Sequence, residues 1–232
     1  MWTGLDLLFP PSCGGCGKMG ERWCDHCQQS LTLLPELVCD ICGEPQMAIG
    51  ICGKCKISRP PYQALRSWVV FSDPVRPALH KLKYRRDIGL GDALALPLAK
   101  YVRVLNWDVE MLVPIPLSSQ RLSERGYNQV DLIARPLAMI HQWNYTPGAL
   151  QRIRSTPSQV GLTAKQRWEN VHNAFLANPR LVRNKKVLLM DDVTTTGATL
   201  ISASRALVEA GACQVYALTA ARAISRRGPD IA

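Results

Sequence analysis

The sequence predicts an α/β fold, in which a mainly parallel sheet carries helices on both faces and follows a small cysteine-rich module. Eight of the nine cysteines lie in the segment 13–55. After residue 60, short apolar runs alternate with segments of helical spacing, which is the pattern of a parallel sheet covered on both sides. The run at residues 187–190 is apolar without alternation, as in a strand buried on both faces.

The chain divides into two units and a tail. We expect a cysteine-rich double zinc ribbon over residues 1–60, a larger domain over 61–225 and a loose tail over 226–232. Residues 1–60 hold five Lys or Arg and six Asp or Glu, whereas the remainder holds 23 and 12. The positive charge of the larger part suits a polyanion, either nucleic acid or a small ligand rich in phosphate.

Composition excludes several classes of protein. Hydrophobic residues make up 47% and charged residues 20%, a globular balance that excludes disordered, collagen-like and coiled-coil chains. No run of 18 apolar residues occurs, so a membrane-spanning helix is not expected. The N-terminus lacks a basic leader and carries Asp6 within its apolar stretch, so we expect a cytoplasmic protein.

The expected elements of the larger domain alternate along the chain. Apolar runs predict strands over residues 67–71, 111–113, 150–153, 187–190 and 215–219. Helical spacing predicts helices over residues 75–84, 90–105, 129–140, 163–171 and 199–210. Pro97 predicts a kink or break in its helix, and Pro136 argues locally against the helix at 129–140. Gly211 is expected to close the last helix.

Four C-x-x-C pairs predict two closed metal sites. A C-x-x-C turn places two sulfurs on one side of a tight turn, at about the separation that tetrahedral zinc needs. Pairing in sequence order is favoured over interleaved pairing, because each short hairpin can then close its own site. The expected ligands of two structural zinc ions are Cys13, Cys16, Cys24, Cys27, Cys39, Cys42, Cys52 and Cys55.

Other roles of these cysteines are less favoured. A redox C-x-x-C usually occurs once, beside a thioredoxin-like pattern, and iron–sulfur clusters also use four thiolates. A catalytic zinc is not expected, because four thiolates leave no open position. His26 is expected to be exposed rather than a ligand. Cys213 precedes an apolar run and is expected to be an inert buried thiol.

The segment 187–199 carries the sharpest functional signal. An apolar strand ends in Asp191 and Asp192, and a hydroxyl-rich loop then leads into a helix. Such a loop faces the ligand crevice of a parallel sheet, and the N–H groups that open the helix bind phosphate. The candidate phosphate ligands are Thr194, Thr195, Thr196, Gly197, Ala198 and Thr199. The two carboxylates, the candidate catalytic pair, can hold ribose hydroxyls or Mg²⁺. The alternative is a polar turn and a capped helix without a ligand.

This segment closely resembles the phosphoribosyl pyrophosphate (PRPP) motif of type I phosphoribosyltransferases. Residues 113–129, which contain Arg121 and Arg125, join a strand end to a helix and could hold pyrophosphate. The stretch from Arg152 to Asn170, which contains Arg167, resembles the mobile loop that closes over PRPP in such enzymes. The resemblance implies that these four arginines contact PRPP.

The whole chain, over about residues 5–222, resembles the ComF family of phosphoribosyltransferase-like competence proteins, also called GntX-like. The likeness is carried by the C-x-x-C pairs, residues 81–84, 113–116, 125–129 and 191–199, and Thr156, Pro157, Gln159, Arg167 and Asn170. It implies binding of PRPP, with magnesium, or of a related 5′-phosphorylated ribose or nucleotide. It also implies a role in the uptake or utilisation of external DNA, with single-stranded DNA and DNA-uptake proteins as candidate partners.

The alternative is a catalytically active phosphoribosyltransferase that acts on a base or amine in nucleotide salvage. Such an enzyme needs a hood that recognises the nucleobase, and no set of residues in this sequence indicates a particular base. Binding is therefore favoured over transfer.

A basic stretch precedes the second predicted helix. It contains Arg76, His80, Lys81, Lys83, Arg85 and Arg86, and it is either a nucleic-acid contact or a solvated helix face. Tyr84 and Trp68 could stack on bases. For Trp68, which lies within a predicted strand, partial burial is preferred.

Overall fold

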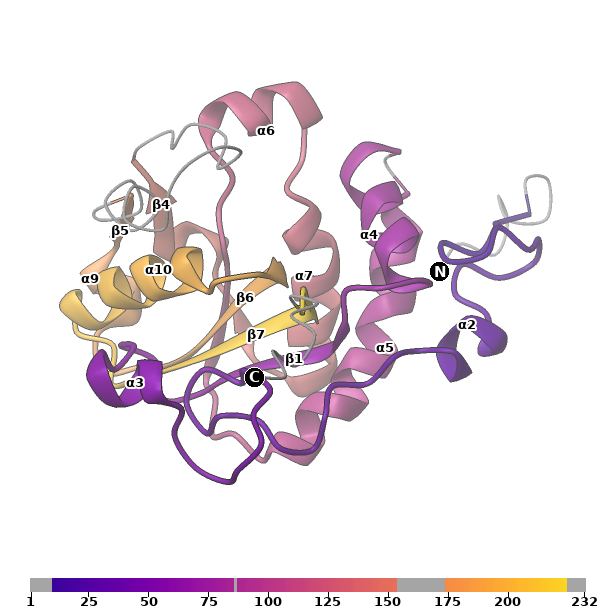
Figure 1. Ribbon diagram of the computed structural model, residues 1–232. Coiled ribbons are helices and arrows are strands. Elements are labelled where there is room, and N and C mark those ends of the chain that lie inside the picture. Colours follow the sequence, from indigo (N-terminus) through magenta and orange to yellow (C-terminus); the bar gives the residue numbers. More distant parts are fainter. Residues whose placement is uncertain (1–9, 86, 154–173, 225–232) are drawn as a thin grey trace.

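A parallel sheet organises the larger part of the chain (Figure 1). The computed structural model describes residues 10–85, 87–153 and 174–224. Within these ranges, five strands pair in the order β1-β7-β6-β2-β3, and all four pairings are parallel. The strands are β1 (Leu65–Val70), β2 (Met111–Pro114), β3 (Asn144–Tyr145), β6 (Lys186–Thr194) and β7 (Gln214–Arg222). Because the strands are parallel, their carboxyl ends meet at one edge, and the predicted fold class is confirmed.

The central strand β6 divides its side chains between two cores. Val187 and Leu189 belong to one hydrophobic cluster and Leu188 and Met190 to the other, and all four are fully buried. This is the expected behaviour of a strand covered on both faces. The strand is longer than the predicted 187–190, because its backbone pairing with β7 continues to Thr194 and depends little on side-chain polarity.

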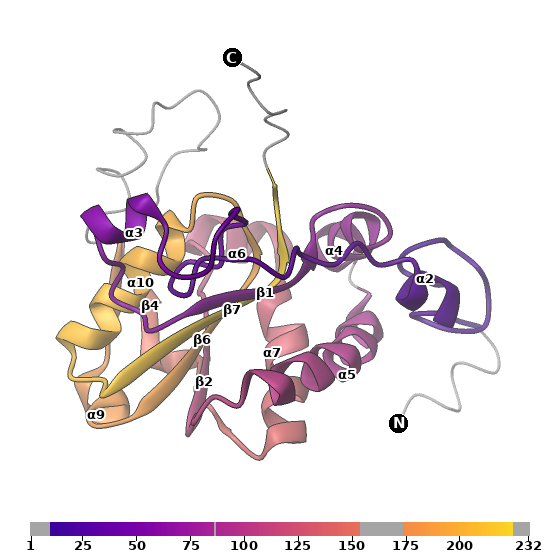
Figure 2. The ribbon, with the colours of Figure 1, turned by 60° about the horizontal axis from the view of Figure 1, so that its bottom comes forward.

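One face of the sheet is covered by α4 (Val75–Tyr84), α5 (Ile88–Leu105) and α7 (Gln129–His141) (Figure 2). Pro97 and Pro136 lie inside α5 and α7 without ending them, so the predicted break is wrong. Buried residues before and after each proline pack on the same core, and this packing outweighs the local cost of proline.

The other face is covered by α10 (Ala198–Glu209) and α9 (Pro179–Val182), together with η1 (Pro147–Ala149) and the antiparallel pair of β4 (Leu150–Arg152) and β5 (Phe175–Ala177). The predicted strand at 150–153 thus exists, but it lies outside the main sheet. Gly197, in the left-handed region with φ +76°, caps the start of α10. Gly211, with φ +94°, follows the end of that helix as predicted.

Sequence periodicity missed α6 (Ser119–Arg125), a short helix between β2 and α7. It has no buried residue, so it lacks the apolar stripe that makes a helix visible in a sequence. Its signals are at its ends: the Ser118 side chain accepts a hydrogen bond from the Arg121 N–H, and Gly126 ends it with φ +76°.

The cysteine-rich segment forms two small units on opposite sides of the molecule (Figures 1 and 2). We call residues 12–30 the first ribbon, which contains α2 (Asp25–Gln29), and residues 38–57 the second ribbon, which contains α3 (Gly53–Ile57). The first lies near α4 and the start of α5. The second packs on the α10 side of the sheet, where Cys39, Ile41 and Cys55 join the main core.

Several predictions fall outside the described residues. They concern Arg86, the helix at 163–171, the tail at 226–232, and Thr156, Pro157, Gln159, Arg167 and Asn170. In the part of the chain that the structure does describe, no helix has the length and apolar character needed to span a membrane.

Candidate functional site

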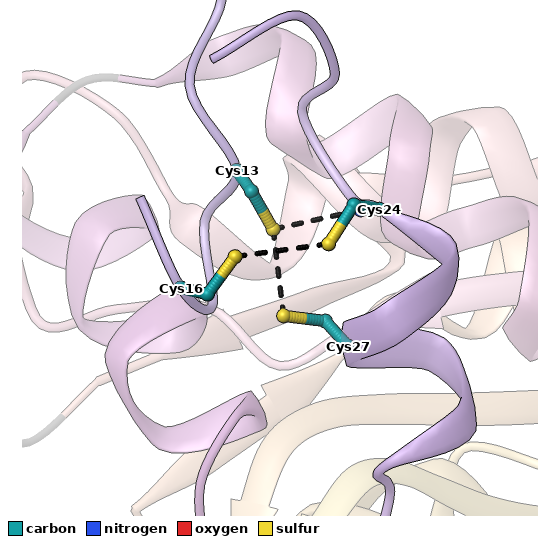
Figure 3. A group of neighbouring side chains, drawn as sticks. All are labelled: Cys13, Cys16, Cys24 and Cys27. Carbon is teal, nitrogen blue, oxygen red and sulfur yellow. Dashed lines mark hydrogen bonds between the residues drawn. The ribbon is translucent and has the colours of Figure 1, made fainter. Parts of the chain in front are cut away.

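The first ribbon gathers four sulfurs around one point (Figure 3). All four Sγ atoms lie within 4.8 Å of one another, with Cys13–Cys27 at 3.6 Å and Cys16–Cys24 at 3.7 Å. A tetrahedral zinc ion with bonds of about 2.3 Å separates its sulfur ligands by about 3.8 Å. The arrangement therefore suits a structural zinc ion.

The second ribbon repeats this arrangement with Cys39, Cys42, Cys52 and Cys55, and the sulfurs of Cys42 and Cys52 are 3.7 Å apart. The two groups follow sequence order, so the prediction of sequential pairing is confirmed. His26 is exposed and belongs to neither group, as predicted.

Backbone amides prepare one thiol of each ribbon for metal binding. Burial raises the pKa of the Cys13 thiol, but N–H groups of Cys16, Cys24 and Gly15 outweigh it and lower the pKa to about 6. In the second ribbon, burial again opposes amide donors at Cys52, Cys42 and Ile41, and the pKa of Cys39 falls to about 6. The thiolate is the form that binds metal.

Cys213 is exposed, so the prediction of a buried thiol is wrong. It lies just before β7, and its backbone N–H donates to the Lys185 carbonyl at the sheet margin. The burial of the strand begins only at Val215.

The acidic pair lies near the carboxyl end of β6, and its two members have different surroundings. Asp192 is 6% exposed and accepts from Lys83 Nζ at 2.7 Å and from Gln129 Nε2 at 3.1 Å. Asp191 is half-buried and forms no ion pair with any described residue. Burial, with the nearby charge of Asp192, raises the pKa of Asp191 to about 7. Side-chain contacts thus anchor Asp192, whereas no ion pair with a described residue holds Asp191.

Sequence reasoning missed two partners of this pair. In the sequence Lys83 is one cation of a basic stretch, but its side chain forms an ion pair with Asp192. In the sequence, Gln129 stands out only within the segment 125–129, which carries the family resemblance. Its signal was its position at the start of α7, since a helix that follows a strand of a parallel sheet begins at the ligand-binding edge.

The residues between α6 and α7 hold Gln129 in place. Asn128 caps α7 and donates its side-chain amide to the Ile115 carbonyl at 3.0 Å. Arg125 donates to Gln129 Oε1 at 2.7 Å, and its guanidinium lies 5.1 Å from the centre of the Tyr84 ring. Arg125, a candidate pyrophosphate ligand, is therefore linked to Asp192 by two successive hydrogen bonds through the Gln129 side chain.

The loop that follows the acidic pair opens α10. Thr195 and Thr196 are exposed, whereas Ala198 and Thr199 are half-buried at the start of the helix. Thr194 is buried, and its hydroxyl has no hydrogen-bond partner in the described structure. This loop offers exposed hydroxyls and helix N–H groups, which together suit a phosphate.

Two of the candidate arginines, on β4 and α6, lie near one another. Arg152, on β4, stacks over the Phe175 ring at 5.6 Å. Its pKa is lowered by burial and by the charge of Arg121, and the charge of Asp191 opposes this shift. Arg121, on α6, is exposed. Arg152 is therefore within electrostatic range of both Arg121 and Asp191.

Arg222 was not singled out in the sequence, and it links the second ribbon to this edge. It is 3% exposed at the end of β7, opposite Thr194 in the strand register. It forms an ion pair with Glu44 at 2.8 Å and donates to the Cys42 carbonyl.

Comparison with known proteins gives matches for both parts of the chain. A family model of a double zinc ribbon domain matches residues 4–56, and one of a phosphoribosyl transferase domain matches residues 106–232. The DNA utilization protein YhgH of Escherichia coli strain K12 is 32% identical over 83% of this chain and 86% of its own length. Competence protein F of Haemophilus influenzae is 30% identical over 86% of this chain and 90% of its own.

Competence protein ComFC of Bacillus subtilis is 28% identical over 90% of this chain and 84% of its own length. Among solved structures, the glutamine PRPP amidotransferase from B. subtilis aligns with 75% of this chain but only 32% of its own, at 21% identity and a TM-score of 0.37. The family match rests on the sequence relatives and the two domain models.

Proposed function

This chain belongs to the ComF family, and from that premise we propose that it binds PRPP or a related 5′-phosphorylated ribose or nucleotide. The proposed site is the edge of the sheet formed by Asp191, Asp192 and the loop at 195–199. The proposed role of the chain is in the uptake or utilisation of external DNA, and the names of its relatives support this role.

The observation that carries the proposal is that the two carboxylates have different side-chain partners. Lys83 and Gln129 hold Asp192 in a fixed position, so that carboxylate has little capacity left for a ligand. Asp191 beside it has no such partner among the described residues. Asp191 would bind a ribose hydroxyl, either directly or through the Mg²⁺ that arrives with PRPP. Asp192 would keep the neighbouring Asp191 in position.

The loop supports binding of the 5′-phosphate. Gly197 adopts φ +76° at the N-cap of α10, and the N–H groups that open this helix would bind the phosphate. Thr195 and Thr196 supply exposed hydroxyls beside them. The phosphate would sit away from the carboxylates, since like charges repel.

The arginines support binding of the pyrophosphate. Arg152 lies within electrostatic range of Asp191, and Arg121, on another element, lies within range of Arg152, so a negative ligand would relieve the repulsion between the two arginines. Arg125 lies close by through its hydrogen bond to Gln129. Arg167, outside the described residues, remains a candidate from the family resemblance alone.

The proposal is tested by calorimetric titration of the zinc-loaded chain with PRPP, with and without Mg²⁺. Gly197→Val should weaken binding at least tenfold, because a branched residue is strained at that φ angle and distorts the phosphate loop. Asp191→Asn should weaken PRPP binding and reduce its dependence on Mg²⁺. Gly148→Ala is the matched control, because no described atom lies within 4 Å of the added carbon.

Ribose-5-phosphate separates the two halves of the site. It lacks pyrophosphate, so its binding should still be sensitive to Gly197→Val but depend little on Mg²⁺. Absence of binding for both ligands at millimolar concentration would contradict the proposal. Release of pyrophosphate when PRPP is supplied with a nucleobase would instead establish a transferase.

A further inference from the structure

The loop at 195–199, which we call the phosphate loop, lies against residues that also contact the second ribbon. A Cβ atom at Gly197 would lie 3.8 Å from the Tyr62 hydroxyl and 3.9 Å from both Leu65 Cδ2 and Thr194 Oγ1. Tyr62 and Leu65 are 2% and 1% exposed, and they belong to the hydrophobic cluster that contains two cysteines of the second ribbon. The phosphate loop therefore rests on the same core as these zinc ligands.

Arg222 makes a second, polar connection between the loop and the ribbon. It lies at the end of β7 and pairs in register with Thr194, the last residue of β6 before the phosphate loop. Its guanidinium forms an ion pair with Glu44 at 2.8 Å and donates to the Cys42 carbonyl. Residues paired in register on neighbouring strands point to the same face of a sheet, so the strand end and the second ribbon meet at this face.

Two buried polar atoms at this junction have no hydrogen-bond partner in the described structure. They are the Thr194 hydroxyl and the Arg222 Nε, and each residue is 3% exposed. Buried polar atoms are nearly always paired, so two unpaired ones on paired residues need an explanation. A phosphate loop that shifts when it binds its ligand supplies one, because such a shift can bring partners to both atoms.

The first ribbon is attached to a different part of the molecule. Lys81 of α4 donates to the Cys13 carbonyl, and Arg22 pairs with Asp87, the residue before α5. Both helices cover the face of the sheet opposite to α10 and the second ribbon. The two ribbons therefore offer a comparison within one chain, since only the second contacts the residues that support the phosphate loop.

We propose that the second ribbon positions the phosphate loop through Tyr62, Leu65 and Arg222, so that zinc in this ribbon and a 5′-phosphate on the loop strengthen each other's binding. Tyr62 and Arg222 are positioning residues, because they act on the ligand through the loop. The coupling is reciprocal: the factor by which zinc strengthens phosphate binding equals the factor by which phosphate strengthens zinc binding. The inference rests on the proposed function for its ligand, whereas the link between ribbon and loop can be tested without one.

Amide hydrogen exchange of the zinc-loaded full chain tests this link in the absence of ligand. Glu44→Ala removes the ion-pair partner of Arg222, and the Glu44 side chain is 48% exposed, so the core stays intact. Exchange over residues 192–202 should become about fivefold faster or more, because the strand end and the start of α10 open more readily. The matched control is Glu36→Ala, the same change at an exposed acid before the ribbon, which should alter exchange by less than about twofold.

Calorimetric titration with ribose-5-phosphate measures the effect on the ligand. Glu44→Ala should weaken binding by about fivefold or more, at the lower end of couplings between sites, and Glu36→Ala by less than about twofold. Neither acid belongs to the proposed phosphate site, so a loss confined to Glu44→Ala reports on the support of the loop.

Zinc affinity, measured by competition with a chelator, tests the reciprocal effect. Cys13→Ser should retain only the zinc of the second ribbon, and saturating ribose-5-phosphate should raise the affinity for that zinc by about fivefold or more. Gly197→Val in the same background should abolish the increase, because it distorts the loop and leaves the zinc ligands of the second ribbon in place. A merely structural contact between ribbon and sheet would not respond to the ligand.

Equal exchange rates in Glu44→Ala and Glu36→Ala would overturn the proposal. Ribose-5-phosphate that binds equally well to both variants, or that leaves zinc affinity unchanged, would also overturn it and would leave the proposed function standing. If the wild-type chain binds neither PRPP nor ribose-5-phosphate, faster exchange in Glu44→Ala alone would support the link between ribbon and loop and contradict only the proposed function.

Discussion

The two ribbons have the same ligand chemistry but different relations to the rest of the chain. In the second, Cys39 and Cys55 belong to the same hydrophobic cluster as Leu65, Val187 and Leu200. In the first, Cys13, Cys24 and Cys27 form a small cluster of their own with Trp23. One metal site is thus part of the main core, and the other is a satellite.

The second ribbon is joined to the sheet by backbone and buried charge. The Leu65 N–H donates to the Ile41 carbonyl at 2.6 Å, and Arg222 ties β7 to Glu44 and Cys42. Since Arg222 pairs in register with Thr194, this ribbon also supports the strand end that carries the phosphate loop.

Polar contacts at its surface join the first ribbon to the rest of the chain, together with the partly buried Trp23, which packs against the core of α4, α5 and α7. Lys81 reaches the Cys13 carbonyl, and Arg22 pairs with Asp87 while both remain about one-fifth exposed. Such contacts hold a unit in place with less energy than a shared core does. The comparison teaches that a zinc ribbon can complete a core or stand beside it, depending on what its non-ligand residues contact.

The largest effect is expected from removing one zinc ligand in each ribbon. Cys39→Ser and Cys13→Ser both replace fully buried ligands, and each should release about one zinc ion as measured by elemental analysis. Only Cys39→Ser should also open the main core, lowering the melting temperature by about 10 °C or more. Equal thermal losses in the two variants would break the comparison, and iron in the purified protein would contradict the zinc assignment.

The glycine after the second cysteine of each ribbon provides a sharper test. Gly17 and Gly43 both have positive φ, so alanine should cost about 1 kcal/mol at either position. A side chain at Gly43 would also collide with the Leu65 carbonyl oxygen, whereas no described atom lies within 4 Å of one at Gly17. Gly43→Ala should therefore destabilise by about 3 kcal/mol in urea unfolding. Similar losses for Gly17→Ala would show that the first ribbon is as closely packed as the second.

The polar contacts that join the two ribbons to the rest of the chain should differ in the same direction, with the larger loss of stability at the second ribbon. Arg222→Met removes a buried ion pair and a hydrogen bond to a carbonyl, and should cost about 2 kcal/mol. Lys81→Met removes a half-buried hydrogen bond and should cost less than about 1 kcal/mol. Chemical denaturation of both variants measures this difference, and the reverse order would refute the assignment of core and satellite.

The smallest effect concerns the pH dependence of stability that Asp191 causes at the carboxyl edge of the sheet. Because burial raises the pKa of Asp191 from 3.8 to about 7, the folded protein keeps a proton there that the unfolded chain has released. The stability that this proton contributes is present below about pH 4 and is lost as pH rises through 7. Asp191→Asn should therefore be more stable than wild type by about 1 kcal/mol at pH 8, without ligand or divalent metal, and the gain should vanish near pH 4. A gain that does not change with pH would contradict this.

Much of the fold could be predicted because its signals are local. The unbroken apolar run at 187–190 indicated the central strand, and Gly211 indicated the end of the last helix. Local sequence signals were misleading at two prolines and absent at one helix. Pro97 and Pro136 are accommodated by packing on both sides of them, and α6 carries no apolar stripe.

The candidate site was predicted in part for the same reason. Asp191, Asp192 and the loop at 195–199 are contiguous, so their pattern can be read in one segment. Gln129 lies 63 residues from its partner Asp192, and nothing in the spacing of either residue indicates that contact. Lys83 appeared as one more cation in a basic stretch until the orientation of α4 was known.

The sequence by itself determined the chemistry of each unit: two sets of four thiolates closed in sequence order, an apolar central strand, and an acidic pair followed by a phosphate-type loop. These features depend on residues close together in the chain. Only the tertiary structure decided which ribbon joined the core, which carboxylate was anchored, and which lysine of α4 faced the first ribbon. Those outcomes depend on contacts between residues as far apart as Glu44 and Arg222, separated by 178 positions, where packing and burial decide which side chains meet.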